Sequence, residues 1–282
     1  MASVPHTPGT TPAVPKPTTP PRRRGPVESL LVEAGELTRF FGTSLAALPG
    51  ALTYASEGLR QASMMLRGTI PLIFMMQLFQ GAVIGTFGFF LLRGIGAGDF
   101  FGLTTGVVGP RQTACTMFGY VFTAKIGCGI TAELGAMKIQ QEVDALESTG
   151  VDPRRYLIGT RLIGVLIFAP VAAFVSLIAT LVGAFLIVVV LLGGLTTNTL
   201  TDVHWSVQGF GDSIFVMVTC TVIAVTTAIV SCFYGLRTVG GPAAVGTSVA
   251  RSLVVNLVLL HLIAAFGAVV IFGLDAKLPI GG

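Results

Sequence analysis

The stretch from Leu162 to Leu192, LIGVLIFAPVAAFVSLIATLVGAFLIVVVLL, decides the fold class, because its 31 residues include no charged side chain. It does not alternate apolar with polar residues, which favours a helix over a membrane β-strand. As a helix it is about 46 Å long, more than the roughly 30 Å of a bilayer's hydrocarbon core. We therefore expect Pro170 and Gly183 to kink or tilt this helix, or part of it to extend beyond the bilayer.

The composition of the whole chain agrees with a location in a membrane. Of its 282 residues, 52% are hydrophobic and 11% are charged, whereas a soluble domain carries about 25% charged residues. Lipid offers no hydrogen bonds to the backbone, so only helices and closed barrels satisfy their polar groups there. The chain is predicted to be an all-α polytopic membrane protein with about five transmembrane helices, over residues 70–92, 107–135, 157–192, 213–236 and 252–274.

Two regions are predicted before the first span. Residues 1–26 hold eight of the 15 prolines and cannot bury a core, so they are predicted to form a disordered cytosolic tail. Residues 27–67 carry apolar side chains at steps of three and four, which predicts N-terminal amphipathic helices that lie on the cytosolic leaflet. A solvated helix packed on another subunit is the alternative. The transmembrane domain then covers residues 68–276.

The distribution of Lys and Arg orients the spans. Cytosolic loops of membrane proteins carry the excess of basic residues. In this chain they gather before the first span, between spans two and three, and between spans four and five, whereas the opposite loops hold little beyond Arg93 and Lys277. The N-terminus is therefore predicted to be cytosolic and the C-terminus outside. The net charge of +4 comes without interleaved basic and aromatic residues, so no nucleic-acid partner is expected.

Two titratable side chains fall deep inside predicted spans. Lys125 lies about 15 Å from the cytosolic end of span two, where a charge marks either a functional site or a structural charge that snorkels or pairs with a neighbour. His261, in the last span, is more often a hydrogen-bonded packing residue. No Asp or Glu occupies the centre of a span. This pattern disfavours a proton- or cation-coupled transporter and favours a weakly polar, lipid-like cargo.

The loop between spans two and three departs from the positive-inside pattern. Residues 136–149 are predicted to form a short cytosolic helix in which Lys138 pairs with Glu142 at i,i+4. Its surface carries an acidic cluster of Glu142, Asp144 and Glu147, and its other face is apolar, with Ile139, Val143 and Leu146. Such a helix is suited to docking on a soluble partner; a solvated loop helix is the alternative.

The sequence contains no G-x-x-x-x-G-K-[ST] nucleotide motif, so any ATP chemistry is expected on another chain. It also contains no disulfide framework and no metal-ligand spacing, and we expect neither a metal nor a cofactor. Small residues recur every four positions in span two, at Gly127, Thr131 and Gly135, which predicts a helix buried among others. The cysteines are expected to be packing residues inside the spans: Cys115, Cys128, Cys220 and Cys232.

Several cytosolic segments together resemble one family. Residues 28–275 are similar to the MlaE/YrbE permeases, the membrane subunits of Mce-type ABC lipid transporters. The long, specific part of the resemblance is Ile130–Lys138 (ITAELGAMK), Glu142–Glu147 (EVDALE) and Gly150–Leu157 (GVDPRRYL), and a second loop supports it with Tyr234–Gly241 (YGLRTVGG), Val245-Gly246 and Arg251.

The resemblance implies a transport role without an enzyme activity of the chain's own. It implies a permease dimer in the inner (plasma) membrane, with a second YrbE-like chain, two ATPase subunits, and an Mce protein outside that exchanges lipid with the dimer. The cargo is expected to be phospholipid, fatty acid, mycolic acid or sterol. Phe74 and Leu78 in span one are expected on the lipid path, and the ATPase-coupling residues are expected to be Glu133, Lys138, Glu142, Asp144, Leu146 and Glu147.

This chain departs from the family pattern at four places, which suits one half of a heterodimer. Lys125 stands where an Arg is frequent, and Ala264 stands near the place of an acid in the last span. The family's Arg-Glu-Leu-Gly-Pro and Gly-Gly-Ala-Glu-Gly are replaced by Arg111-Gln112-Thr113-Ala114-Cys115 and Gly240-Gly241-Pro242-Ala243-Ala244. Two rival classes remain open at this point: a secondary transporter or channel, and a membrane scaffold that transports nothing.

Overall fold

The structure, a computed structural model, describes residues 26–274, and every regular element in that range is a helix. The all-α fold class is thereby confirmed. The predicted tail lies outside the described residues except for Pro26. The chain divides into two units, residues 1–36 and 37–282. The first is described only as the start of α1, and the account below concerns residues from Leu37 onward.

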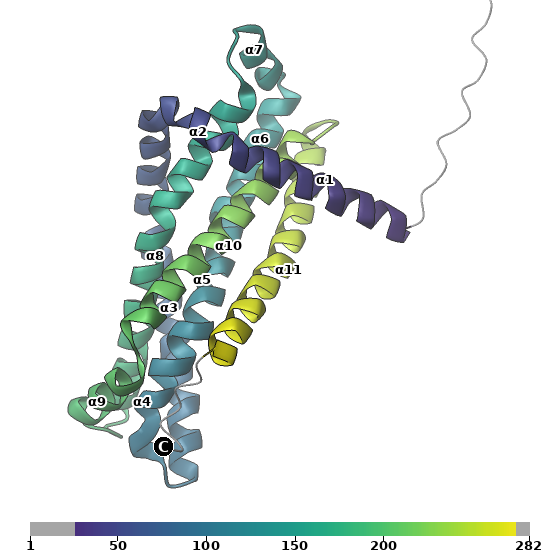
Figure 1. Cartoon of the computed structure of the whole chain (residues 1–282). Coiled ribbons are helices and arrows are strands. Elements are labelled where there is room, and N and C mark those ends of the chain that lie inside the picture. Colours follow the sequence, from purple (N-terminus) through teal and green to yellow (C-terminus); the bar gives the residue numbers. More distant parts are fainter. Residues whose placement is uncertain (1–25, 275–282) are drawn as a thin grey trace, which may run out of the picture. The chain divides into compact units, whose positions relative to one another are not determined.

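The helices follow one another with short connections (Figure 1). Four of them, η3 to η6, are π-helical. Their bounds are α1 Pro26–Ala46, α2 Leu48–Ala51, η1 Leu52–Tyr54, α3 Ala55–Gly94, η2 Gly98–Phe100, α4 Phe101–Leu103, η3 Thr104–Ala114, α5 Cys115–Phe122, η4 Thr123–Gly127, α6 Cys128–Ile139, α7 Glu142–Ser148, η5 Arg154–Gly159, α8 Thr160–Phe185, η6 Leu186–Leu191, α9 Thr197–Val207, α10 Phe210–Leu236 and α11 Pro242–Leu274.

Four helical runs in the described part of the chain are long and apolar enough to cross a membrane: Leu48–Gly94, Arg154–Leu191, Phe210–Leu236 and Pro242–Val270. They confirm a polytopic membrane protein. The predicted span over 107–135 lies in a further continuous run, Phe101–Ile139, which is more polar than these four. A fifth crossing therefore stays a prediction. Residues 55–67, expected to be interfacial, continue into span one as part of the single helix α3.

The polar run from Phe101 to Ile139 packs against α3, α8, α10 and α11. Its polar groups are satisfied inside the bundle. The Gln77 side chain donates to the Ala114 carbonyl at 2.9 Å and accepts from the Thr180 hydroxyl at 2.9 Å. Thr131 donates to the Ser252 hydroxyl at 3.0 Å. A Cβ at Gly127 would lie 2.9 Å from Thr227 Cγ2, so the predicted small-residue face is buried.

The contact between α3 and α8 depends on glycine. A Cβ at Gly81 would collide with the Thr180 carbonyl, and one at Gly183 would collide with the Leu78 carbonyl. The two helix backbones therefore touch where side chains are absent, which is the packing that replaces the hydrophobic effect between helices in lipid. Gly183 serves this close approach; the kink, the tilt or the extension beyond the bilayer that we expected for this helix stays a prediction.

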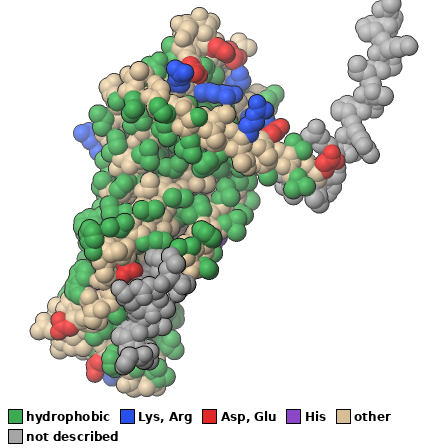
Figure 2. All heavy atoms as spheres, viewed as in Figure 1, with side chains coloured by type: hydrophobic (Ala, Val, Ile, Leu, Met, Phe, Trp, Pro, Cys, Tyr) green, Lys and Arg blue, Asp and Glu red, His purple; other side chains and the backbone are tan. Residues whose placement is uncertain are grey.

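Charged side chains gather at the ends of the bundle. Figure 2 shows most of the visible Lys and Arg near the end that carries α7, with a broad apolar band below them. The opposite end carries α9 (Figure 1), a helix in a segment where the sequence indicated none. Thr196 caps α9 by accepting a hydrogen bond from the Thr199 N–H at 3.2 Å.

His204 anchors α9 to the bundle. Its side chain is buried, and its Nδ1 lies 3.0 Å from the Thr105 hydroxyl. Gly102 permits this approach, since a Cβ there would lie 2.6 Å from Val203 Cβ. Burial lowers the pKa of His204 below its ordinary value, and a hydrogen bond with the Gln208 side chain offsets part of that shift. The imidazole is therefore held neutral in the folded protein.

This lowered pKa predicts a loss of stability on acidification. The folded state binds the His204 proton more weakly than the unfolded state, so stability is complete above the unfolded pKa of about 6.5 and falls as the pH drops through the folded pKa. Thermal unfolding of the detergent-solubilised chain between pH 7.5 and pH 5 measures this loss of stability. His204→Asn should remove this part of the pH dependence, whereas His261→Gln should keep it. An unchanged profile in His204→Asn would contradict the assignment.

Candidate functional site

The α7 end of the bundle holds most of the residues that were predicted to couple to an ATPase. α6 ends at Ile139, and Gln141 adopts a left-handed backbone with φ of 61° before α7 begins. The predicted ion pair between Lys138 and Glu142 is therefore wrong, because the break removes their i,i+4 relation. Lys138 Nζ instead pairs with Asp144 Oδ1 at 2.7 Å, across the turn.

The two faces of α7 have different roles. Val143 is buried in the main core cluster, and Leu146 packs against it. The apolar face is thus used inside this chain and anchors α7 to the bundle. The acidic side chains of Glu142, Asp144 and Glu147 are exposed. Any partner of α7 therefore meets carboxylates rather than an apolar stripe.

Glu133 is joined to a buried arginine that the sequence analysis did not single out. Arg161 Nη2 lies 2.8 Å from Glu133 Oε1, and Arg161 Nη1 donates to the Leu157 carbonyl at 2.8 Å. The Arg161 side chain is 4% exposed, whereas that of Glu133 is 57% exposed. This pair links α6, which leads into α7, to the start of α8. The signal in the sequence was a charge five residues inside the predicted third span.

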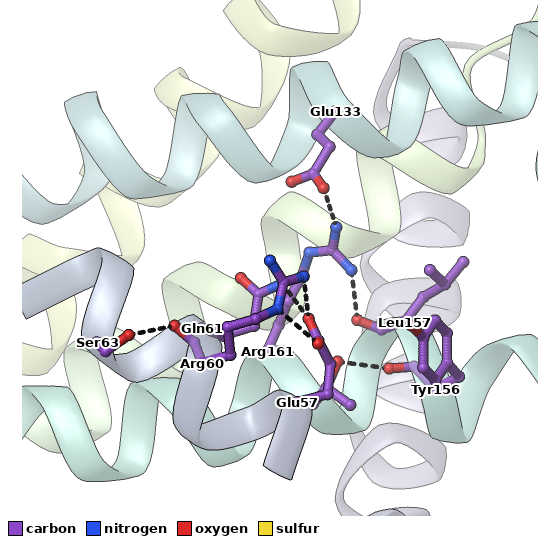
Figure 3. A network of polar contacts seen from close by, with 9 residues as sticks. Glu57, Arg60, Gln61, Ser63, Glu133, Tyr156, Leu157 and Arg161 are labelled. Atoms are coloured by element: carbon purple, nitrogen blue, oxygen red, sulfur yellow. Dashed lines mark hydrogen bonds and ion pairs between the residues drawn. The ribbon is translucent and has the colours of Figure 1, made fainter. Parts of the chain in front are cut away.

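A second ion pair, within α3, lies beside the Glu133–Arg161 pair. Arg60 contacts the Glu57 carboxylate at 2.6 Å, and the Gln61 amide donates to the same carboxylate at 3.1 Å. Figure 3 shows these α3 side chains next to Arg161, with Glu133 approaching from the other side. Side chains of α3, α6 and α8 therefore meet in one polar network close to α7.

Removing the charge of Glu133 should destabilise the chain, because it leaves the buried Arg161 guanidinium without its carboxylate. Since Glu133 is itself half exposed, we expect Glu133→Gln to lower the free energy of unfolding by about 1–2 kcal/mol. Chemical unfolding in detergent provides the measurement. Glu147→Gln, an exposed acid on α7, is the matched control and should change stability by less than about 0.5 kcal/mol. Equal effects in the two variants would refute the importance of the pair.

Lys125 lies at the edge of a groove on the bundle surface. Its Nζ donates to the Gly68 carbonyl of α3, so its charge is paired with a backbone oxygen. The groove has a volume of about 520 Å³ and is almost entirely apolar. It is lined by Leu72, Met76, Met117, Tyr120, Val121, Ala124 and Lys125.

His261 is hydrogen-bonded through both ring nitrogens. Its Nε2 lies 2.8 Å from the Tyr120 hydroxyl and its Nδ1 lies 2.7 Å from the Leu257 carbonyl. Because a carbonyl only accepts, Nδ1 carries a proton, and in the neutral ring Nε2 accepts from Tyr120. The Tyr120–His261 pair thus joins α5 to α11 beside the groove.

The residues predicted for a lipid path lie near the groove without lining it. Phe74 is exposed, and Leu78 lies where α3 approaches α8, with its carbonyl facing Gly183. The α3 residues of the groove are Leu72 and Met76, which point about 200° around the helix from Phe74. The four cysteines are free, and three of them are buried.

Long apolar helices with a polar run packed among them define the chain as a polytopic membrane protein. A family model described as Permease MlaE matches residues 59–270. The chain belongs to the MlaE permease family.

Relatives from distant organisms agree with this assignment. A probable ABC transporter permease protein of Rickettsia typhi is 26% identical over 213 residues, which cover 76% of this chain and 82% of the relative. One from Synechocystis is 29% identical over 164 residues, covering 56% of this chain and 62% of the relative. Protein TRIGALACTOSYLDIACYLGLYCEROL 1, chloroplastic, from Arabidopsis thaliana is 28% identical over 151 residues, covering 52% and 42%.

The chain is therefore a membrane permease of an ABC transporter, a transport subunit rather than an enzyme. A permease of this class works with an ATPase partner.

Proposed function

We propose that this permease moves lipid between the inner (plasma) membrane and an Mce protein, driven by two copies of a separate ATPase that dock on α7. The observation that carries the proposal is the packing of α7. Its apolar face packs on the bundle through Val143 and Leu146, while the acidic side chains of its other face are exposed to a partner. A helix held in this way transmits a push from the partner into the bundle instead of bending away.

The polar network extends this coupling route. Movement of α7 acts first on α6 through the Lys138–Asp144 pair and the short turn between the helices. From α6 it reaches α8 through Glu133 and Arg161, and α3 lies beside that pair. Nucleotide binding and hydrolysis take place on the ATPase, because the sequence has no nucleotide motif of its own.

The proposed cargo is a lipid, as phospholipid, fatty acid, mycolic acid or sterol. The groove beside Lys125 has apolar walls and a few polar groups at its edge, which matches an amphiphile. The Arabidopsis relative is named after a glycolipid, trigalactosyldiacylglycerol. We further propose that a second YrbE-like chain covers this face in a heterodimer, with Phe74 and Leu78 of α3 close to the path.

The proposed orientation places the N-terminus in the cytosol and the C-terminus outside. It is supported by the basic residues near α7 (Figure 2), since cytosolic surfaces of membrane proteins are enriched in Lys and Arg. The end that carries α9 then faces the Mce protein. Two rival functions are a secondary transporter or channel and a scaffold that transports nothing. Purification in detergent distinguishes both from the proposal, because neither rival would retain an ATPase subunit.

Charge reversal on α7 tests the coupling role. Glu142→Lys with Asp144→Lys should lower ATP-driven lipid transfer by about tenfold or more, equivalent to about 1.4 kcal/mol, because a basic partner surface is repelled. Folding should be little affected, since both side chains are exposed and the Lys138–Asp144 pair that Asp144→Lys breaks lies at the surface, where an ion pair stabilises little. Asp99→Lys with Asp202→Lys makes the same change of charge at the other end and should leave co-purification of the ATPase subunits unchanged, whereas the α7 variant should weaken it. Normal transfer by the α7 variant would refute coupling through this face.

Polar substitutions along α3 test the lipid route in reconstituted vesicles with a fluorescent lipid. Met76→Asn, in the wall of the groove, should lower transfer by about tenfold, because an amide obstructs an apolar path. Phe74→Asn and Leu78→Asn, outside that wall, should lower transfer by less. Val171→Asn, at an exposed position of α8, is the control for membrane insertion. An equal loss in Val171→Asn would assign the effect to insertion, and normal transfer by Phe74→Asn and Leu78→Asn would remove those two residues from the path.

A further inference from the structure

A second hollow lies at the α7 end of the bundle, away from the groove. It has a volume of about 330 Å³ and lies between the last turn of α1, α2 and the turn that precedes η5. Its floor is made of small residues, Ala46, Ala47 and Gly50. Polar groups from Thr43 and from the segment Asp152–Arg155 complete the wall. Small residues and two arginines therefore line the same hollow.

The depth of this hollow relative to a bilayer follows from the packing of α2. Ala51 is fully buried, and a Cβ at Gly159 would collide with it, so α2 rests on the first turns of the run Arg154–Leu191. Arg154 and Arg155 open this candidate span, about 6–8 Å before Gly159. The hollow thus lies at the end of this candidate span, on the side where lipid head groups are expected if the span crosses the bilayer.

The charges around the hollow are arranged for an anion. Asp152 Oδ1 accepts a hydrogen bond from the Arg154 backbone N–H at 2.9 Å, and Asp152 Oδ2 lies 3.2 Å from Arg155 Nε. The carboxylate therefore holds the backbone and one edge of Arg155, which leaves the terminal nitrogens of Arg155 available. Within residues 26–274 the Arg154 guanidinium forms no ion pair. Two guanidiniums and one carboxylate leave a net positive charge.

Gly50 fixes the position of one guanidinium. A Cβ at Gly50 would lie 3.2 Å from both Cδ and Nε of Arg155, so the Arg155 side chain lies along the bare backbone of α2. Its reach into the hollow is thereby defined by packing as well as by Asp152. Leu45 and Leu52, near the hollow in the chain, expose apolar side chains, at 39% and 65%. Exposed apolar side chains therefore occur within two residues of the hollow's lining along the chain.

We propose that this hollow binds the phosphate of an anionic phospholipid of the cytosolic leaflet. Guanidinium groups bind phosphate oxygens through paired hydrogen bonds, and basic pockets between membrane helices on the cytosolic side recognise anionic head groups. Leu45 and Leu52 supply contacts for the acyl chains. This lipid is a fixed ligand that holds α2 against η5. It is separate from the cargo, and the inference does not depend on transport.

Native mass spectrometry of the purified full chain, titrated with phosphatidylglycerol and separately with phosphatidylcholine, tests the proposal. Arg154→Gln with Arg155→Gln should weaken phosphatidylglycerol binding about tenfold and leave phosphatidylcholine binding unchanged. The matched control is Arg67→Gln with Arg251→Gln, which removes two exposed positive charges outside the hollow. It should bind phosphatidylglycerol within about twofold of the natural chain.

A second variant separates loss of the site from loss of folding. Gly50→Leu keeps both arginines in the chain, but its side chain fills the hollow and displaces Arg155 from α2, so it should also weaken phosphatidylglycerol binding. Equal binding in the natural chain and in both variants would overturn the proposal. Displacement of the lipid by millimolar inorganic phosphate would overturn the lipid assignment in favour of a free-phosphate site. Loss of ATPase co-purification in the arginine variant, with unchanged lipid binding, would assign the hollow to the partner protein instead.

Discussion

The burial of a polar helical run among apolar helices is the constraint on which the rest of this structure depends. Between helices in lipid the hydrophobic effect contributes little, so contacts rely on close backbone approach and on hydrogen bonds. The run Phe101–Ile139 uses both: Gly127 lets it approach α10, and Gln77 and Thr131 connect it to α3, α10 and α11. Because unpaired polar groups are costly there, each of these bonds also selects one arrangement of the helices around it.

That arrangement brings the charged residues of three helices together beneath α7. Arg161 is almost fully buried, and a buried guanidinium is tolerated only with its partners in place. Glu133 and the Leu157 carbonyl supply them, so α6 and α8 hold one register. α7 then projects from this rigid base with its carboxylates outward, which suits a permease that receives its energy from another protein. At the opposite end, too, a buried polar side chain has a partner in the bundle: the neutral imidazole of His204 lies against the Thr105 hydroxyl.

The groove and the hollow differ in a way that agrees with the two lipid contacts that we propose. The groove beside Lys125 is wide and apolar, and its one ammonium group is already paired with the Gly68 carbonyl. The hollow near Arg154 is smaller, and the pair with Asp152 uses only the Nε of Arg155, so other guanidinium N–H groups can donate to a ligand. The first suits passage of many amphiphiles, and the second suits retention of one anionic head group. A moving cargo and a fixed lipid need different chemistry, because specific hydrogen bonds slow release.

Much of this protein follows from its sequence alone, since membrane burial imposes a simple rule: long runs without charge become helices. Leu162–Leu192 determined the fold class, and the segments from Ile130 to Leu157 determined the family and the acidic helix. Three features were decided only by the tertiary structure. The left-handed backbone at Gln141 reorients α7, so that Lys138 forms its ion pair with Asp144. Arg161 forms an ion pair with Glu133. The apolar face of α7 packs against the core of this chain. Hydropathy and periodicity describe one helix at a time, whereas each of these outcomes depends on which helices meet, and that is decided by glycine contacts and polar pairs far apart in the chain.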